Sequence, residues 1–194
     1  MRIYDISQEI FSCAVYPGDP KPEKHTLYST GAGDLYNLTS FAMCAHNGTH
    51  IDAPFHFLHN GKTVDRIELS IFVGDCYVAR HEGNVTAEDA EEILKKADGA
   101  ERILIAGKAT VTAEAAEVFA TSGIRLLGNE GQTVGPEDAP MQVHLILLRA
   151  GLALLEGVVL DKVPEGRYFL SAAPLNLGGA DGAPCRAYLI QEEK

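Results

Sequence analysis

Residues 45–57 read AHNGTHIDAPFHF, and no other segment of the chain concentrates as many metal-binding and proton-transferring side chains. The side chains in question are His46, His50, Asp52 and His56. All four stand at even-numbered positions, and alternate residues of an extended chain share one face. Gly48 and Pro54 argue against a helix through the segment. We therefore predict a strand that enters and leaves a tight turn at Gly48, with the four side chains converging on one point.

These side-chain types are the ones that bind divalent transition metals. Such ions bind neutral imidazole and carboxylate, and catalytic sites keep one position open for water. His46, His50 and Asp52 offer three suitable ligands, and the second oxygen of Asp52 would allow it to bridge a second ion. His56 could complete the coordination, or it could stand off the metal as a general acid/base, because imidazole titrates near neutral pH. Four convergent groups argue against a set of unrelated hydrogen-bonded histidines.

A second ion would need ligands from elsewhere in the chain, and two residues stand out. His144 lies in the otherwise apolar stretch 141–148, MQVHLILL, and Glu156 precedes the apolar residues 157–160, GVVL. Burying an imidazole or a carboxylate is costly unless it is paired or bound to metal. A lone histidine in an apolar helix is more often a hydrogen-bonded core residue, so the residue types alone leave both interpretations open.

Length and composition indicate one domain, residues 1–194, large enough to enclose a core. The hydrophobic share of 46% and the charged share of 22% are ordinary for a soluble globular protein. The net charge of −11 disfavours nucleic acid and anionic membranes as partners, since both attract basic surfaces. We expect a cytoplasmic protein, because no segment resembles a membrane span or the apolar core of a signal peptide. The four cysteines form no CxxC pair, which argues against a disulfide framework.

The remaining patterns predict strands and helices in mixed order. Strands are expected at residues 3–6, 38–45, 71–79, 102–106, 124–127, 158–160, 168–172 and 186–190, and helices at 86–96, 112–123 and 136–150. Thr86 and Asp89 resemble a capping box, and Thr112 suits the start of the second helix. Strands outnumber helices, and no helix separates the first two strands. The predicted fold class is therefore α/β, a single domain with a mixed β-sheet and flanking helices.

A turn-rich loop precedes the histidine segment. Residues 16–22 read YPGDPKP, and proline fixes the backbone φ angle at three of these positions. Tyr16 at the head of the loop could form one wall of a substrate site, or the loop could be a plain surface turn.

Residues 46–57 match the signature HxGTHxDxPxHF of the cyclase family of metal-dependent hydrolases, which includes bacterial kynurenine formamidases and isatin hydrolases. Other segments resemble the family in the same order along the chain: residues 5–7 its opening strand, 16–19 its WPGD loop, 155–160 its LEGLVL segment and 174–187 its closing PL…GxDGxPxRA. The resemblance spans nearly the whole chain, and the sequence is identified as a member of this family.

The resemblance implies a site for two divalent ions, usually zinc in the formamidases and manganese in the isatin hydrolases. Its implied ligands are His46, His50 and Asp52 for one ion, and Asp52, His144 and Glu156 for the other. His144 and Glu156 keep the family's spacing of twelve residues. His56 would be the catalytic acid/base. The family also implies a swivelling β/β/α-type fold and a homodimer whose active site lies close to the subunit interface.

Two departures from the family pattern concern the substrate. Tyr16 takes the place of the tryptophan that contacts substrate in the formamidases, and the chain contains no tryptophan. Formamidases tend to carry paired histidines where only His144 stands here, because Leu145 follows it. Both changes leave the metal ligands intact and open the question of which amide is bound. Tyr16 is therefore our candidate substrate-binding residue.

The expected reaction is hydrolysis of an amide, formamide or lactam C–N bond of a small molecule. A metal-bound water would lose its proton and attack the carbonyl, and His56 would protonate the leaving nitrogen. One alternative is a non-haem iron oxygenase, since two histidines and a carboxylate also form its facial triad. Another is a catalytically silent metal- or metabolite-binding protein. Five prospective ligands favour hydrolysis over the first, and His56 disfavours the second, because metal storage needs no acid/base.

Overall fold

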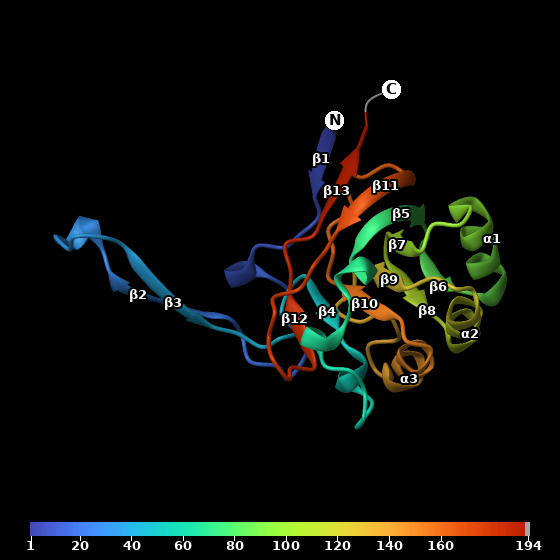
Figure 1. Cartoon of the computed structure of the whole chain (residues 1–194), viewed down its shortest axis with the longest axis horizontal. Coiled ribbons are helices and arrows are strands. Elements are labelled where there is room, and N and C mark those ends of the chain that lie inside the picture. Colours follow the sequence, from blue (N-terminus) through green and yellow to red (C-terminus); the bar gives the residue numbers. More distant parts are fainter. Residues whose placement is uncertain (193–194) are drawn as a thin grey trace.

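A curled mixed sheet forms the body of the molecule (Figure 1). The computed structural model describes residues 1–192, and within them nine strands join this sheet. In spatial order they are β1 (Arg2–Asp5), β13 (Tyr188–Gln191), β11 (Gly166–Ser171), β5 (Val73–Arg80), β7 (Arg102–Ala106), β9 (Leu126–Asn129), β10 (Ala153–Glu156), β4 (His50–Asp52) and β12 (Gly182–Pro184). The central strands β5, β7, β9 and β10 run parallel, and the other pairs are antiparallel. The predicted α/β fold with a mixed sheet is confirmed.

Three α-helices within residues 1–192 cover one face of the sheet (Figure 1). They are α1 (Ala87–Ala97), α2 (Ala113–Thr121) and α3 (Met141–Arg149), and each lies between two of the parallel strands in the chain. The predicted capping box opens α1: Thr86 accepts a hydrogen bond from the N–H of Asp89 at 3.2 Å, and Asp89 accepts one from the N–H of Thr86 at 2.9 Å. Thr112 caps α2, also as predicted. None of the described helices combines the length and apolar character that crossing a membrane requires.

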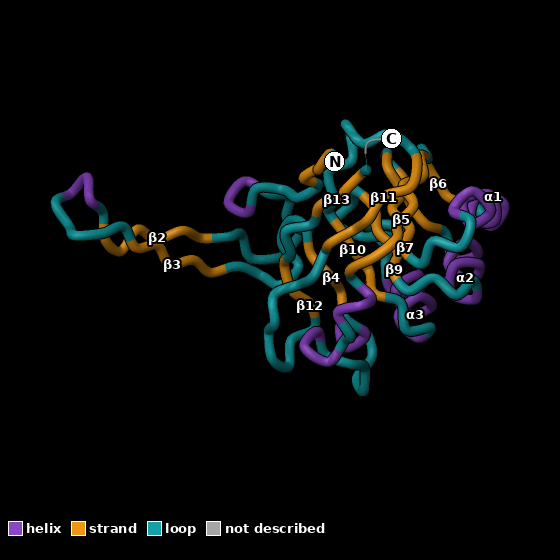
Figure 2. Tube along the Cα trace, turned by 45° about the horizontal axis from the view of Figure 1, so that its top comes forward, coloured by secondary structure: helices purple, strands orange, loops and turns teal. Residues whose placement is uncertain are grey.

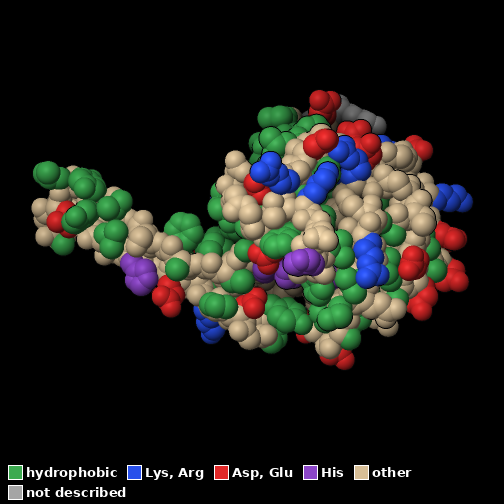
Figure 3. Space-filling model, turned by 60° about the horizontal axis from the view of Figure 1, so that its bottom comes forward, with side chains coloured by type: hydrophobic (Ala, Val, Ile, Leu, Met, Phe, Trp, Pro, Cys, Tyr) green, Lys and Arg blue, Asp and Glu red, His purple; other side chains and the backbone are tan. Residues whose placement is uncertain are grey.

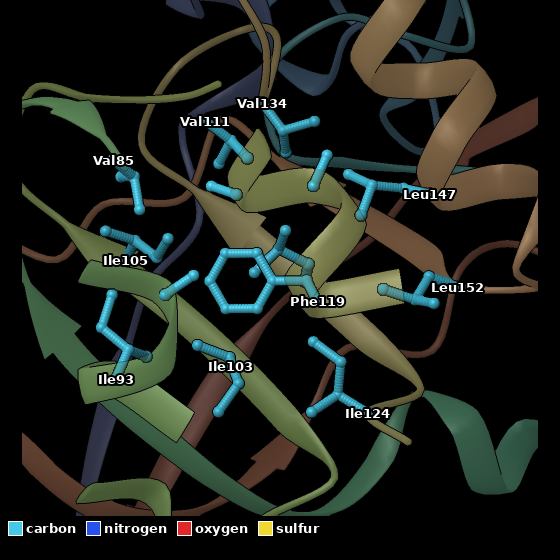
Figure 4. Packing of buried hydrophobic residues seen from close by; sticks show 14 of the residues in the cluster. Val85, Ile93, Ile103, Ile105, Val111, Phe119, Ile124, Val134, Leu147 and Leu152 are labelled. Carbon is cyan, nitrogen blue, oxygen red and sulfur yellow. The ribbon is translucent and has the colours of Figure 1, made fainter. Parts of the chain in front are cut away.

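The core between sheet and helices is built around Phe119 of α2 (Figure 4). All side chains of β7 are buried. Ile103 and Ile105 belong to the cluster beneath the helices, whereas Leu104 and Ala106 belong to the cluster on the opposite face. A parallel strand buried on both faces reads as a continuous apolar run, which is why β7 coincides with its predicted range.

A two-stranded antiparallel hairpin projects away from this body (Figures 1 and 2). Its strands are β2 (Glu23–Tyr28) and β3 (Leu38–Ala42), and we name residues 23–42 the arm. Every residue of β2 is exposed. The strand predicted at 38–45 is confirmed as far as Ala42, but its partner β2 was not predicted, because EKHTLY shows neither an apolar run nor alternation.

The third predicted helix is wrong at its start. The helix α3 begins at Met141 and not at residue 136. Residues 136–140 form a turn-rich connection, so the proline that precedes the helix is Pro140 and not Pro136. Proline is tolerated at this point, because the first turn of a helix leaves its N–H groups without intrahelical partners.

The strand predicted at residues 158–160 is also wrong in position. The strand is β10, which ends four residues earlier than predicted, and the chain leaves the sheet at Gly157. Gly157 has a φ angle of +67°, and its N–H donates to the carbonyl of Gly131 at 2.7 Å instead of to a neighbouring strand. Glu156 is therefore the last residue of β10, whereas the predicted ranges leave it between the helix at 136–150 and the strand at 158–160.

A short parallel pair completes the fold beside the main sheet. It consists of β6 (Gly83–Val85) and β8 (Ala109–Val111). Like β4 and β12, these strands have only three residues each, too few for a periodic pattern to show in the sequence.

Candidate metal centre

The six residues predicted to bind metal or transfer protons meet where β4 lies between β10 and β12. They are His46, His50, Asp52, His56, His144 and Glu156. A seventh residue, Asp181, joins them, and we name the seven residues together the histidine–carboxylate centre.

The strand β4 positions the two most deeply placed side chains from the histidine segment. His50 and Asp52 project from one face of β4, and Ile51 between them is buried in the core on the other face. Glu156 lies directly opposite His50 in the antiparallel pairing of β10 with β4. Cross-strand partners share a face, so this pairing alone brings a residue from far along the chain next to His50.

The segment 45–57 is not one continuous strand, which corrects the predicted arrangement. His46 lies in the turn before β4, and His56 ends a short 3₁₀-helix that begins at Pro54. Only the two side chains that belong to β4 therefore share one face of an extended strand. His46 and His56 reach the centre because the chain bends back on both sides of this strand.

The turn predicted at Gly48 is confirmed. Gly48 has a φ angle of +64°, and a Cβ atom there would lie 2.9 Å from the Cβ of Cys13. Its carbonyl accepts a hydrogen bond from His50 Nδ1 at 2.9 Å. The turn therefore does two things: it brings His46 back toward β4, and it orients the ring of His50.

Asp52 lies at the middle of the centre, and each of its carboxylate oxygens faces two imidazoles. Oδ1 lies 2.7 Å from His46 Nδ1 and 3.3 Å from His50 Nε2. Oδ2 lies 3.4 Å from His144 Nε2 and 4.0 Å from His56 Nε2. Asp52 is 1% exposed, so these imidazoles replace water as its surroundings. A carboxylate surrounded in this way has one oxygen available to each of two cations.

Backbone carbonyls fix two of the rings. His144 Nδ1 donates to the carbonyl of Pro140 at 2.9 Å, just as His50 Nδ1 donates to that of Gly48. A carbonyl only accepts, so Nδ1 carries a proton in both rings and Nε2 is the atom that faces Glu156. The Nε2 atoms of His144 and His50 lie 3.2 and 3.5 Å from its two oxygens. Metal-binding histidines are oriented in this manner, with one ring nitrogen held and the other presented.

The buried carboxylates require positive charge beside them. Burial raises the pKa of Asp52, but the three neighbouring histidines His144, His46 and His50 outweigh burial and hold it well below its ordinary value. Burial lowers the pKa of His50 and of His144, yet the neighbouring carboxylates of Asp52 and Glu156 raise both values to about 10. Protonated imidazoles or bound cations can supply that charge, and the two compete for the same nitrogen lone pairs.

The residues fit a divalent metal ion. Two groups of three have all their ligand atoms within 4.8 Å of one another, namely His46, Asp52 and His56, and His50, Asp52 and Glu156. Asp52 belongs to both groups, as expected of a bridging ligand. His50 Nε2 is buried and has no hydrogen-bond partner among residues 1–192. Imidazole nitrogen together with carboxylate oxygen is a donor set suited to zinc and manganese.

A cavity of about 370 Å³ opens over the centre. Histidine and acidic side chains gather at the middle of this face of the body (Figure 3). Tyr16, Phe57 and Pro140 contribute to the walls. The hydroxyl of Tyr16 donates to the carbonyl of Glu137 at 2.7 Å, which leaves its ring and the hydroxyl oxygen, as an acceptor, for a ligand. The volume suits a small molecule, and the role of Tyr16 as a substrate contact stays a prediction.

Comparison with known families shows to which family the chain belongs. The model of the Cyclase family, described as "Putative cyclase", matches residues 4–136, more than half of the sequence. The chain belongs to the cyclase family. The predicted family resemblance is thereby confirmed.

Relatives of this cyclase-family protein match over nearly its whole length. The kynurenine formamidase of Sphingopyxis alaskensis is 35% identical over 205 residues, which cover 97% of each chain. The kynurenine formamidase of Bacillus thuringiensis subsp. konkukian is also 35% identical, over 95% of each chain. These matches extend past the family model and include the part of the chain that carries His144, Glu156 and Asp181.

Solved structures agree with the fold. A protein described as a potential metal-dependent hydrolase with cyclase activity superposes with a TM-score of 0.84 at 30% identity, covering 100% of this chain and 99% of its own. Isatin hydrolase A from Labrenzia aggregata gives a TM-score of 0.85 over 98% of this chain and 94% of its own, at 22% identity. The second likeness shows the fold alone.

Asp181 is the residue of the centre that the sequence did not reveal. It lies just before β12, and its Oδ2 is 2.8 Å from His46 Nε2 and 3.2 Å from His56 Nδ1. In the sequence, residues 179–187 counted only toward the family resemblance. The signal that could have drawn attention to it is a single carboxylate in the otherwise uncharged run GGADGAPC. Nothing local to that run indicates that β12 pairs with β4.

Proposed function

We propose that this cyclase-family protein hydrolyses the C–N bond of an N-formyl aryl amine, an arylformamidase-type reaction that depends on a divalent metal. Relatives that carry the name kynurenine formamidase over 97% of the chain support an amide hydrolase. The proposal rests above all on the surroundings of Asp52. Each of its two oxygens faces two imidazoles from different elements. Such a carboxylate suits a site that holds metal ions next to an acid/base side chain.

The proposed ligands form two sets that share Asp52. His46, His50 and Asp52 would hold one ion, and Asp52, His144 and Glu156 the other. When bound, such ions supply Lewis-acid chemistry, since they activate water and stabilise negative charge on a carbonyl oxygen. Zinc is our first choice because the set is rich in imidazole, and manganese is the second.

His56 is the proposed acid/base, and its exposure supports this role. Its side chain is 29% exposed, whereas those of His50, His144 and Glu156 are at most 3% exposed. It is therefore the histidine that a substrate in the cavity would meet. Its Nε2 faces Asp52 Oδ2 at 4.0 Å, and Nε2 would take up a proton from the attacking water and pass it to the departing amine nitrogen.

The cavity favours a flat aromatic substrate. Tyr16 and Phe57 line it together with Pro140, and aromatic rings make favourable contacts with one another. Because Tyr16 already donates its hydroxyl proton to Glu137, we propose that it binds the aryl group by ring contact.

The test combines metal analysis with a substrate panel. Purified protein should contain zinc or manganese by elemental analysis and should release formate from N-formyl aryl amines faster than it opens isatin or small cyclic amides. Turnover of the cyclic amides alone would contradict the proposed open-chain specificity. Oxygen consumption by iron-loaded protein with one of these substrates would overturn hydrolysis in favour of an oxygenase, and inactivity of the metal-loaded protein on the whole panel would favour a silent binding protein.

We also propose that the chain forms a homodimer through the arm. An isolated two-stranded hairpin is marginally stable in water, and this one exposes Leu27, Tyr28, Leu35, Tyr36, Leu38 and Phe41. A cavity of about 600 Å³ lies at the root of the arm and includes Phe11, Phe41 and Leu175 in its walls. A second copy of this chain would cover both apolar surfaces, and small-molecule substrate remains the other proposed partner. A cytoplasmic location stays a prediction.

Light scattering tests the dimer. The wild-type chain should elute as a dimer, and the double variant Leu35→Asp with Tyr36→Asp should elute as a monomer. Leu69→Asp is a matched control, because Leu69 is also exposed, at 66%, but lies on the body. A wild-type monomer, or a double variant that stays dimeric, would contradict the proposal.

A further inference from the structure

One carboxylate oxygen at the rim of the cavity contacts two imidazoles at once. Asp181 Oδ2 lies 2.8 Å from His46 Nε2 and 3.2 Å from His56 Nδ1. The two rings lie against each other, with their centroids 4.1 Å apart and their planes tilted by 33°. The side chain of Asp181 is 44% exposed, in contrast to the fully enclosed Asp52. Asp181 therefore contacts the centre from the solvent side.

The backbone around Asp181 is fixed on both sides. Its carbonyl accepts a hydrogen bond from the N–H of Ala53 at 2.9 Å, and the next residue, Gly182, pairs with Asp52 across β12 and β4. A Cβ atom on Gly182 would lie 2.7 Å from the ring of His46. Glycine at this position lets the imidazole pack directly on the backbone of β12. The carboxylate is thus placed by the sheet and not by a mobile loop.

This contact decides which nitrogen of His56 faces the reaction. A carboxylate oxygen only accepts hydrogen bonds, so His56 Nδ1 must be the nitrogen that carries a proton toward Asp181. Nε2 then faces Asp52 and the cavity. No other hydrogen bond to the ring of His56 is present among the described residues, so Asp181 is what holds the ring against a half-turn about Cβ–Cγ, which would exchange Nδ1 with Cδ2 and Nε2 with Cε1.

We infer that Asp181 is a positioning residue for His56, which fixes both the tautomer and the orientation of that ring. The inference rests on the proposed function, in which His56 exchanges a proton through Nε2. In that role Asp181 does not contact substrate, and its effect on turnover passes through His56 alone.

Kinetics of two variants separate positioning from metal binding. Asp181→Ala should lower kcat by about 10- to 100-fold, as expected for the loss of an orienting partner, with KM and metal content unchanged. Asp181→Asn keeps an acceptor oxygen in place and should lower kcat by only about fivefold. Asp98→Asn, at the exposed end of α1, removes the same charge away from the cavity and should match the wild type. Loss of metal from Asp181→Asn would overturn the inference and make Asp181 a ligand.

A double-mutant cycle tests whether the effect passes through His56. In a His56→Ala background, Asp181→Ala should cause no further fall in kcat, because no ring remains to be oriented. A further tenfold fall in that background would overturn the inference and point to His46 as the residue that Asp181 serves.

A spectroscopic readout does not depend on activity. Long-range ¹H–¹⁵N spectra of zinc-loaded protein labelled at histidine, with His56 assigned through His56→Ala, should show its neutral ring protonated at Nδ1. Asp181→Asn should retain this form, and Asp181→Ala should shift the ring toward the Nε2-protonated form. An unchanged spectrum in Asp181→Ala would overturn the inference, even if no N-formyl aryl amine is hydrolysed and the proposed function fails.

Discussion

The histidine–carboxylate centre and the arm are neighbours in the sequence and opposites in their surroundings. Asp52 in the centre is 1% exposed, whereas Leu35 near the tip of the arm is 96% exposed. The centre encloses charged groups that must have partners, and it finds them within its own chain. The arm exposes apolar side chains instead. Apolar surface needs no hydrogen-bond partner, but removing it from water is favourable. This contrast is the basis of our proposal that a second copy of the chain covers the arm.

The strongest way to break the centre is to replace its shared carboxylate. Asp52→Asn should lose bound metal and lower kcat/KM by at least about 10⁴-fold, because an amide offers one neutral oxygen where two charged ones are needed. Elemental analysis and steady-state kinetics measure both effects. Glu130→Gln is a matched control, since Glu130 is a partly buried carboxylate that accepts a bond from the N–H of Leu160 at 2.8 Å outside the centre. Full metal content in Asp52→Asn would contradict the assigned role.

A smaller effect separates the acid/base from the ligands. His56→Ala should lower kcat by ~10²–10⁴-fold while the metal content stays that of the wild type, because only proton transfer is lost. His59→Ala, which replaces an exposed histidine three residues after His56, should be indistinguishable from the wild type. If His56→Ala lost metal, His56 would be a ligand, as its grouping with His46 and Asp52 allows.

The dependence of stability on pH distinguishes protons from metal in the centre. The folded-state pKa of His50 and of His144 is raised from 6.5 to about 10. A raised pKa stabilises the fold fully below the unfolded value, and this contribution is lost as pH rises through the folded value. The free energy of unfolding of chelator-treated protein should therefore fall between pH 6.5 and about 10. Urea titrations of the zinc-loaded protein should show a weaker decline, and identical profiles would contradict the competition between cations and protons.

The smallest expected effect lies in the arm. At a concentration where the chain is monomeric, Leu35→Ala should change the free energy of unfolding by less than about 0.5 kcal/mol, because Leu35 buries no surface in its own chain. Phe119→Ala in the core should cost about 3–5 kcal/mol in the same assay. Denaturant titration measures both. A cost for Leu35→Ala close to that for Phe119→Ala would show that the arm is packed against the body.

Sequence patterns predicted those parts of the fold that depend on neighbouring residues. The capping box of Thr86 and Asp89, the cap at Thr112 and the apolar strand β7 all lie where they were expected. Each is decided by side chains within a few residues or by burial on both faces. The arm's β2 escaped prediction because an exposed strand carries no hydrophobic pattern.

The sequence by itself determined six of the seven side chains of the centre, because imidazole and carboxylate suit a divalent metal, and it placed His50 and Asp52 on one face of a strand. The tertiary structure alone decided how the centre is assembled. Pairing β10 and β12 on either side of β4 brings Glu156 opposite His50 and Asp181 against His46 and His56. Strand pairing joins residues far apart in the chain through backbone hydrogen bonds that any sequence can form. The local sequence could draw attention to Asp181 but not to its contacts, because these follow from the strand beside it.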